Sequence, residues 1–463
     1  MARVDWKSFV LTVLIVLVGQ TVAQTSDVVG KMSIGYQGWF ATPFDGSPRK
    51  SWVHWTINAG NGSIPPSPGN CKFEVYPDMR EYTQRYQTGL ASLGNGQPAN
   101  LFSSWDQSTV NIHFSWMQTY GIETVSFQRF GSDLKFPLAR DQMNGVAGNV
   151  QRAAERYGRK VFIQYDLSNW ANFSTELIPD LNTMTILTAS PAYARHNGKR
   201  VICVWGMGFG EPGGNRPNNP TGSLNVINQL KSMGYYIIIG VPYTWRTNDG
   251  ISLPAYAPVY RATNMIQPWS VGTFNSIPTA LAYKSREQGD VQECNRLGID
   301  YQPVIWPGFA WSNWNGPPRN AIPRLNGTFM WRQFMNCQES NITSVFVAMF
   351  DEYDEGTAIA KAAEDASMIP TNQYFLPLNA DGGNLSSDFY LRLVGDGMKL
   401  LRKQITTSPN PPYTPPTPQR TSPNNPANNN RADRFQPFID MMDQMTPSRL
   451  MSLFSTWLTM LGL

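Results

Sequence analysis

Residues 345–363 read VFVAMFDEYDEGTAIAKAA, and this pattern guides the interpretation of the whole chain. Residues 345–350 are apolar, β-branched or aromatic, which predicts a buried strand, and residues 358–364 favour a helix. Side chains three positions apart lie on opposite faces of a strand but are neighbours on a helical turn. If Glu352 and Glu355 act together, the chain must leave the strand at about Glu352. Both would then lie at the carboxyl end of a strand, where parallel α/β sheets and barrels have their active sites.

The acidic residues of this stretch suit general acid and base chemistry: Asp351, Glu352, Asp354 and Glu355. Carboxylates that crowd together push one another's pKa values apart, so that one stays protonated while another is ionised. A retaining glycosidase needs two such groups about 5–5.5 Å apart. Two other interpretations stay open for these residues, a solvated acidic loop and a Ca²⁺ site built from carboxylate oxygens.

The composition excludes several classes of protein. The 463 residues carry a formal net charge of +4 without a basic block, so no nucleic-acid partner is expected. The 3 His residues show no HExxH or similar spacing, so we expect no metal and no other cofactor. Aromatic residues make up 12% of the chain and include 15 Trp. Indole rings are costly at a surface unless they pack or bind something, which favours a binding function.

The first 23 residues resemble a secretory signal peptide. Arg3 and Lys7 precede a short apolar core at residues 9–18, and residues 21–23 suit a cleavage site. An uncleaved anchor is the alternative, but the apolar core is short for a bilayer. Five N-x-S/T sequons follow, at Asn61, Asn172, Asn326, Asn341 and Asn384. We therefore expect a secreted, extracellular glycoprotein.

The four cysteines form neither a disulfide scaffold nor a CxxC metal motif. Cys203 lies in an apolar run and is expected to be a buried free thiol. Cys294 and Cys337 fall on two predicted helices that would be neighbours, and the secretory pathway would allow a disulfide between them.

Segments that predict strands and helices alternate over most of the chain. The expected strands are 32–40, 123–130, 160–166, 200–205, 235–241, 264–269, 301–305 and 345–350. The expected helices are 78–93, 103–120, 138–158, 223–233, 252–259, 276–297, 328–339 and 388–403. Short, mostly apolar strands in this alternation indicate a parallel sheet covered on both faces. The pattern predicts an α/β protein with one (β/α)₈ TIM barrel and long βα loops over residues 24–405, expected to be a monomer. An open doubly wound sheet is the alternative, but no GxGxxG follows the first strand.

Aromatic and polar side chains recur where the predicted strands end. A sugar ring stacks its C–H faces on indole, and its hydroxyls need polar partners at fixed positions. Barrel cores favour branched aliphatic residues instead, so this recurrence predicts a carbohydrate substrate. The residues are Tyr36, Gln37, Trp39, Gln128, Arg129, Tyr165, Asp166, Trp205, Tyr243, Trp245, Gln267, Trp269 and Trp306.

The C-terminal part of the chain differs in composition. Residues 406–434 are rich in Pro, Asn and Thr, which predicts a disordered or extended linker. Residues 435–463 regain apolar character along a predicted amphipathic helix. Self-packing, a membrane-surface helix and a GPI signal are the alternatives for this segment, and any membrane contact is expected through it alone.

Four groups of residues, in this order, resemble glycoside hydrolase family 99, the endo-α-mannosidases, and its barrel relatives of family 71. They are Gly38-Trp39-Phe40 with Pro43-Phe44-Asp45-Gly46 and His54-Trp55; Ser103-Ser104-Trp105-Asp106 with His113 and Gly121-Ile122; Pro307-Gly308-Phe309 with Pro323-Arg324; and FDEYDEGT at 350–357. They span about residues 32–400, and the likeness is greatest to a branch labelled xylosidase/arabinosidase. The resemblance implies a barrel that acts on carbohydrate and adds further expected sugar-binding residues, namely His54, Trp55, Asp106 and Tyr353.

The resemblance also implies a retaining mechanism with a neighbouring group. In the family, the first glutamate of the last motif acts as base on the sugar 2-hydroxyl, which attacks the anomeric carbon. The second glutamate is the general acid and then the base. By position these are Glu352 and Glu355, while Asp166 stands where the family has a sugar-binding glutamate.

This sequence departs from the family pattern around both glutamates. The usual Asn, Trp and His are replaced by Asp351, Tyr353 and Asp354, and His-Ile-Glu is replaced by Gln164-Tyr165-Asp166. Neighbouring groups set pocket shape and pKa, so the sugar stays open. A barrel that binds carbohydrate without cleaving it is the alternative to a glycosidase.

Overall fold

The computed structural model describes residues 25–211 and 213–412 of the chain. The expected signal peptide at 1–23, the linker from 413 onward and the apolar segment at 435–463 lie outside the described residues.

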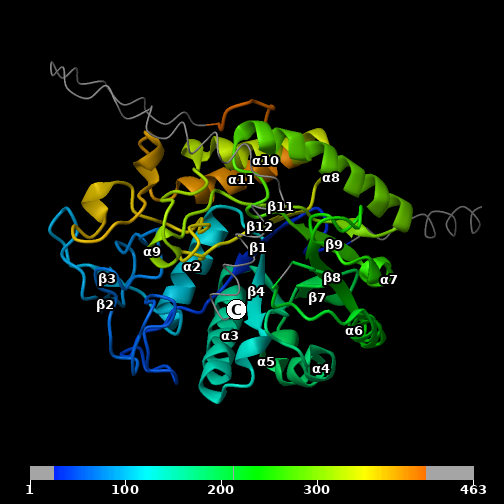
Figure 1. The fold of residues 1–463 in the computed structure, drawn as a ribbon, viewed down its shortest axis with the longest axis horizontal. Helices are drawn as coiled ribbons and strands as arrows, with labels where there is room; N and C mark the ends of the chain where they lie inside the picture. Colours follow the sequence, from blue (N-terminus) through cyan, green and yellow to red (C-terminus); the bar gives the residue numbers. More distant parts are fainter. Residues whose placement is uncertain (1–24, 212, 413–463) are drawn as a thin grey trace, which may run out of the picture.

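Strands at the centre of the molecule form one curled, mostly parallel sheet (Figure 1). In chain order they are β1 (Met32–Tyr36), β4 (Thr124–Phe130), β5 (Lys160–Asp166), β7 (Lys199–Trp205), β8 (Tyr235–Pro242), β9 (Met265–Trp269), β10 (Asp300–Tyr301), β11 (Val304–Ile305) and β12 (Val345–Val347). Three short strands are antiparallel: β2 (Tyr86–Gln87), which pairs with β3 (Asn100–Leu101), and β6 (Arg195–His196), which pairs with β7.

Residues 300–305 close the sheet into a barrel. β10 pairs with β9, and β11, which follows two residues later, pairs with β12. Between them, the Gln302 N–H donates to the Ile266 carbonyl (3.0 Å), and the Phe346 N–H donates to the Pro303 carbonyl (2.9 Å). β1 pairs with both β4 and β12, which completes the ring. The (β/α)₈ barrel predicted from the sequence is confirmed.

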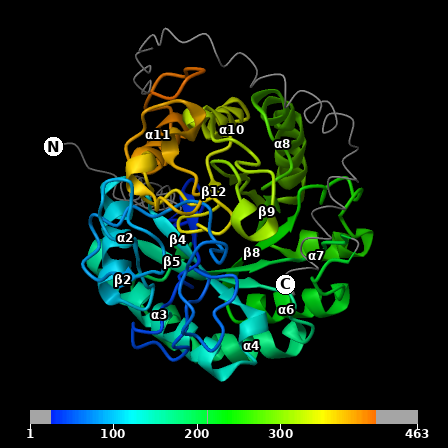
Figure 2. The same ribbon diagram turned by 60° about the vertical axis from the view of Figure 1, so that its left-hand side comes forward.

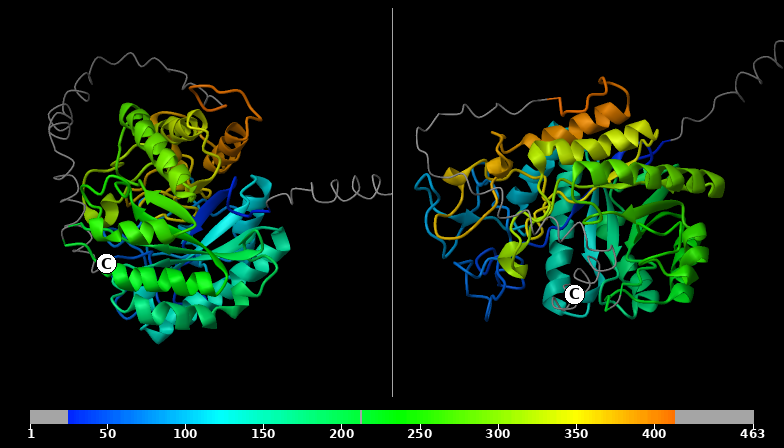
Figure 3. Two further views of the ribbon diagram at one scale, coloured as in Figure 1. Left: turned by 90° about the vertical axis from the view of Figure 1, so that its right-hand side faces the viewer. Right: turned by 45° about the horizontal axis from the view of Figure 1, so that its top comes forward.

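Helices surround these strands in chain order (Figure 2). They are α2 (Gln107–Thr119), α3 (Pro137–Tyr157), α4 (Phe173–Thr183), α6 (Pro220–Ser232), α7 (Ala257–Ala262), α8 (Ile277–Leu297), α10 (Thr328–Glu339) and α11 (Phe389–Leu401). Two helices of four residues lie in loops, α5 (Thr185–Thr188) and α9 (Ser312–Asn315). Figure 3 shows α10 and α11 packed side by side. Within the described part of the chain, no helix has both the length and the apolar character needed to cross a bilayer.

Local sequence signals fix the ends of the two longest helices. α8 begins with a capping box, in which the Ser276 hydroxyl accepts the Thr279 N–H (3.4 Å) and the Thr279 hydroxyl accepts the Ser276 N–H (3.0 Å). α3 begins at Pro137, whose fixed φ suits a first helical turn. Both helices end at a glycine in the left-handed region, Gly158 (φ 61°) and Gly298 (φ 66°).

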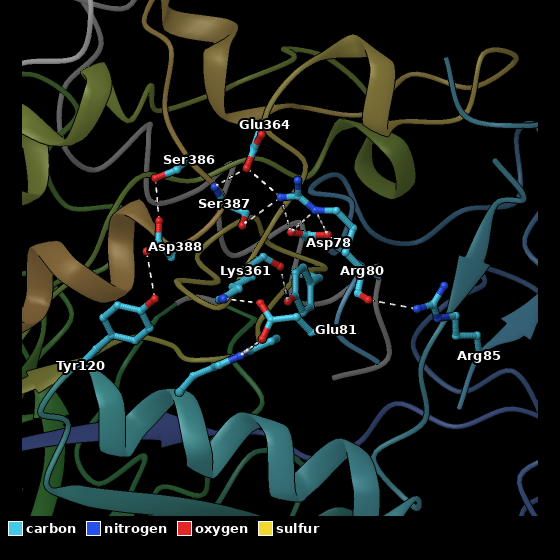
Figure 4. A network of polar contacts seen from close by, with 12 residues as sticks. Asp78, Arg80, Glu81, Arg85, Tyr120, Lys361, Glu364, Ser386, Ser387 and Asp388 are labelled. Atoms are coloured by element: carbon cyan, nitrogen blue, oxygen red, sulfur yellow. Dashed lines mark hydrogen bonds and ion pairs between the residues drawn. The ribbon is translucent and has the colours of Figure 1, made fainter. Parts of the chain in front are cut away.

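The helix predicted at residues 78–93 is wrong, because charged side chains hold the start of this segment as turns (Figure 4). The Arg80 Nε donates to both carboxylate oxygens of Asp78 (2.9 and 3.0 Å), and its Nη2 donates to Glu364 (2.7 Å). These bonds join the loop to the segment that follows β12. Tertiary contacts of this kind override local helix propensity.

The helix predicted at residues 358–364 is also wrong, because this segment is extended. The Ala360 N–H donates to the Phe350 carbonyl (2.9 Å), and the Ala363 N–H donates to the Tyr76 carbonyl (2.9 Å). The backbone therefore finds its hydrogen bonds in neighbouring segments rather than within a helix.

The cysteines are buried free thiols at Cys71, Cys203, Cys294 and Cys337. The expected state of Cys203 is confirmed. Helices α8 and α10 do pack together, but Cys294 and Cys337 form no disulfide between them.

Gly240 in β8 leaves room for the indole of Trp205. A Cβ at Gly240 would lie 2.1 Å from Trp205 Cδ1 and 3.0 Å from its Cα. We expect Gly240→Ala to displace the ring and to lower the free energy of unfolding by about 1–3 kcal/mol, measured by urea denaturation. Gly148→Ala in α3 is the control, because its new Cβ meets only the flexible ends of side chains, Ile186 Cδ1 at 3.3 Å and Arg152 Nη1 at 3.4 Å. An equal loss of stability in the two variants would contradict the clash.

Candidate active site

The chain turns after β12, so that its acidic side chains separate. The Tyr353 N–H donates to the Asp351 carbonyl (3.0 Å), which bends the backbone away from the strand. Glu352, Asp354 and Glu355 line one cavity of about 210 Å³ at the carboxyl end of the barrel. The structure therefore brings together the two glutamates that the sequence singled out.

Asp351 and Tyr353 point away from this cavity. The Asp351 carboxylate accepts the backbone N–H groups of Gln37 (2.7 Å) and Gly38 (2.9 Å), which ties the end of β12 to the end of β1. Tyr353 is fully buried, and its ring packs edge-on against Phe40. These two residues hold the turn in place, while the residues between and after them face the cavity.

Burial dominates the electrostatics of the two glutamates. The pKa of Glu352 is raised well above its ordinary value, first by burial and then by the charges of Asp354 and Glu355. The pKa of Glu355 is raised by burial and by Asp354, while Lys72 and Arg216 lower it. Two carboxyl groups that both resist ionisation retain a proton at pH values where an exposed carboxyl group is fully charged.

Glu352 has one hydrogen-bonded oxygen and one without a partner. Gln37 Nε2 donates to Glu352 Oε2 (2.6 Å), a bond that favours the ionised carboxylate. Glu352 Oε1 is buried and has no hydrogen-bond partner among the described residues. A buried acceptor without a partner is costly, so this oxygen is available to a ligand in the cavity.

His54, Lys72 and Asp354 form a charged cluster at one side of the cavity. His54 Nδ1 lies 2.8 Å from Asp354 Oδ2, and Lys72 Nζ lies 3.4 Å from the same oxygen. Burial, then Lys72, lowers the pKa of His54 to about 4, so the imidazole is neutral at pH 7 and donates its Nδ1–H to the carboxylate. The imidazole stacks on the indole of Trp39 with ring centroids 3.6 Å apart. His54 and Lys72 thus hold Asp354 in place beside the two glutamates.

Nine of the residues predicted from the sequence line the cavity. They include the two glutamates and come from the ends of six strands and the loops that follow them: Gln37, Trp39, His54, Gln128, Asp166, Trp205, Trp269, Glu352 and Glu355.

The other predicted residues do not reach the cavity. Neighbouring positions of a strand point to opposite faces, so Gln128 faces the cavity and Arg129 faces the helices, where it bonds to Asp180 (2.5 Å) on α4. Tyr165 also donates to Asp180 (2.6 Å), for the same reason. The residues placed elsewhere in the packing are Tyr36, Trp55, Asp106, Arg129, Tyr165, Tyr243, Trp245, Gln267, Trp306 and Tyr353.

Asp106 does not reach the cavity for a different reason. It holds the N-cap position of α2 but makes no capping bond with its side chain. Its carboxylate instead accepts the hydroxyl of Tyr86 (3.0 Å), a residue from the loop that was predicted to be a helix.

Several cavity residues carry no local signal in the sequence. Lys72, Asn215 and Arg216 lie in long loops between strands and helices, and all three line the cavity. Only their loop composition could have drawn attention to them, because no periodic pattern places a loop residue.

Two further predictions concern ligands and modification. Among residues 25–211 and 213–412, no group of three or more His, Cys, Asp or Glu side chains could hold a metal ion, so the Ca²⁺ interpretation of the acidic stretch finds no ligand set there. Four of the five sequon asparagines are exposed, at Asn61, Asn172, Asn341 and Asn384. Asn326 is half-buried, and its Nδ2, the atom to which a glycan is attached, donates to the Asp381 carbonyl (3.2 Å). The structure does not favour a glycan at Asn326.

Solved structures with the same fold are glycoside hydrolases. No protein-family model matches the sequence, and no curated protein matches it. Two structures of the GH99 endo-α-mannosidase from Bacteroides thetaiotaomicron, one of them in complex with bis-tris-propane, each align with a TM-score of 0.55 and 16% identity over 81% of this chain and 98% of theirs. A structure described as a glycoside hydrolase-like protein aligns with a TM-score of 0.46 and 14% identity over 70% of this chain and 94% of its own. The likeness to family 99 that the motifs predicted is thereby confirmed at the level of the fold.

Lys72 limits the proton affinity of Glu355, because its ammonium group favours the ionised carboxylate. We expect Lys72→Met to raise the pKa of Glu355 by on the order of one unit. The measurement is a ¹³C NMR titration of the glutamate carboxyl groups in the ligand-free protein. Lys135→Met removes an exposed lysine near the cavity rim and should leave that pKa unchanged. An unchanged or lower pKa of Glu355 in Lys72→Met would contradict this account.

Proposed function

We propose that the protein is a retaining glycoside hydrolase that acts on a polysaccharide or glycan, with an α-mannan-like chain as the first candidate. The observation that carries the proposal is the meeting of Glu352 and Glu355 in one cavity, where burial raises the pKa of both. Trp205 and Trp269 in the cavity wall supply aromatic faces that sugar rings stack on, while the indole of Trp39, which also lines the cavity, is stacked on His54 and Phe130. The signal-like N-terminus and the exposed sequons support secretion as a glycoprotein.

The proposed chemistry has two steps. Glu355 gives its proton to the leaving oxygen, while Glu352 takes the proton of the sugar 2-hydroxyl and that oxygen attacks the anomeric carbon. The glycosidic bond breaks and a 1,2-anhydro sugar forms. Water then opens this ring at the anomeric carbon, with Glu355 taking a proton from water and Glu352 returning one to the 2-oxygen. The anomeric configuration is retained, since the carbon is displaced twice.

The mechanism needs Glu355 protonated and Glu352 ionised. Burial and the charge of Asp354 raise the pKa of both carboxyl groups, and Lys72 lowers both. The hydrogen bond from Gln37 distinguishes the two residues, because it stabilises the ionised form of Glu352.

The size of the cavity supports a substrate longer than one sugar. The cavity that holds the glutamates measures about 210 Å³, and a second, open cavity of about 490 Å³ shares Asp133 with it. Phe136, whose ring is 54% exposed, lines the second cavity and offers a stacking surface. The second cavity has room for the sugars that adjoin the one being cleaved.

A carbohydrate-binding barrel without turnover is the second candidate. The observation that favours it is the departure from the family pattern at Tyr353 and Asp354, which adjoin the two glutamates. Such a protein would bind glycans in the same cavity and release no reducing ends.

The glutamate roles can be separated by leaving-group chemistry, after a screen of α-mannans, α-glucans and arabinoxylans has found a substrate. Glu355→Gln should lose on the order of 10²–10⁴-fold in kcat on that glycan. On the matching 2,4-dinitrophenyl glycoside, whose leaving group needs no proton, it should recover much of the rate of the first step, measured as the initial release of dinitrophenolate. Glu352→Gln should lose activity on both substrates.

Glu293→Gln on α8, whose glutamate pairs with Arg296, is the matched control and should keep full activity. Full activity in Glu352→Gln or Glu355→Gln would show that the substituted glutamate does not have the proposed catalytic role. Glycan binding by the wild-type protein with no new reducing ends would establish the second candidate instead.

A further inference from the structure

The loop between β7 and α6 contributes two neighbouring side chains to the cavity wall, Asn215 and Arg216. The Arg216 side chain is only 8% exposed. Its guanidinium carbon lies 4.8 Å from the ring centroid of Trp205 and 5.1 Å from that of Phe209. An arginine packed over two adjoining aromatic rings is positioned for directed hydrogen bonds.

The hydrogen-bonding capacity of these two side chains is largely unused. Among the described residues, Arg216 Nη1 donates to Glu211 Oε2 at the long distance of 3.4 Å, and Arg216 Nε is buried without a hydrogen-bond partner. Both Asn215 Oδ1 and Asn215 Nδ2 are likewise buried without a partner in the described part of the chain. Burying three such polar atoms is unfavourable unless a ligand supplies their hydrogen-bond partners.

The loop is fixed before any ligand arrives. The Asn169 N–H donates to the Asn215 carbonyl (2.9 Å), and the Leu167 N–H donates to the Trp205 carbonyl (3.1 Å). At the end of the loop, Asn219 Oδ1 accepts the Gly222 N–H (2.8 Å) and caps α6. A site held in this way loses little conformational entropy when it binds a ligand.

The charges of the cavity wall select against an anionic ligand. Two cations line the cavity, Lys72 and Arg216, and each lies 3.4 Å from a carboxylate that offsets it. More carboxyl groups than cations face the same space: Asp133, Asp166, Glu352, Asp354 and Glu355. A uronate or sulfated sugar would find both cations already paired, and each of these carboxyl groups that is ionised would repel it at short range.

We propose that Asn215 and Arg216 are specificity-determining residues that bind two adjacent hydroxyl groups of an uncharged sugar ring. Asn215 offers a donor and an acceptor, which matches a hydroxyl that both donates and accepts, and Arg216 Nε donates to the oxygen beside it. This inference rests on the proposed function in that it takes the cavity to bind sugar. A sugar that lacks one of the two hydroxyls leaves buried polar atoms unpaired, so binding discriminates strongly against it.

The test is a binding cycle in the Glu355→Gln background, where turnover cannot intervene. The probes are methyl α-D-mannopyranoside, methyl α-D-glucopyranoside and methyl β-D-xylopyranoside, with their monodeoxy derivatives and uronates, measured by calorimetry. With Asn215 and Arg216 intact, two adjacent monodeoxy derivatives of the sugar that binds should each bind on the order of 10-fold more weakly than the parent. The corresponding uronate should bind more weakly than the parent as well.

Asn215→Leu and Arg216→Met should each bind the parent sugar on the order of 10-fold more weakly and no longer distinguish it from one of these derivatives. Arg216→Met keeps the apolar stem against Trp205, and thermal unfolding of both variants checks the fold. Arg140→Met at an exposed site on α3 is the control. Unchanged discrimination in both variants, tighter binding of the uronate, or no binding of any probe would overturn the inference. If the wild-type protein discriminates between these sugars but cleaves no glycan, the hydrolase proposal is wrong and the inference about Asn215 and Arg216 holds. If it cleaves a glycan but the sugars bind equally, the hydrolase proposal holds and the inference is wrong.

Discussion

The site depends on one constraint, which is that carboxylates at the end of β12 are buried and must each be compensated. Asp351 uses the N–H groups of Gln37 and Gly38, and Asp354 uses His54 and Lys72. All of these partners belong to the segment after β1. The barrel makes the arrangement possible because it places the first and last strands side by side. Without that pairing the acidic stretch would remain in water, with the pKa values of ordinary surface carboxylates.

The sequence predicted the barrel well, because its strands and packed helices have strong periodicity. Every expected strand is present, and α8 begins and ends within one residue of the expected 276–297. The two wrong helices, 78–93 and 358–364, lie in long segments that bond to each other and to their surroundings. Local propensity carries no information about such partners, which are distant in the chain.

The site was predictable only in part. The pair of glutamates followed from their spacing, since the three-residue interval has one geometry in a turn and another in a strand. The sequence did not predict which of two adjacent strand residues faces the cavity. Arg129 and Tyr165 face the helices instead. Lys72, Asn215 and Arg216 could not be found at all, because loops bring them to the cavity and no pattern in the sequence records where a loop returns.

The hydrogen bond between Gln37 and Glu352 joins residues that are 315 positions apart. During synthesis on the ribosome, the first strand emerges long before the last one, and its outer edge has no partner until β12 has been made. A chain that stopped short of residue 345 would have nearly all of the barrel and none of the acidic stretch. Truncated products would therefore lack these carboxylates and would expose the open edge of β1 to other chains, a feature that quality control in the cell can recognise.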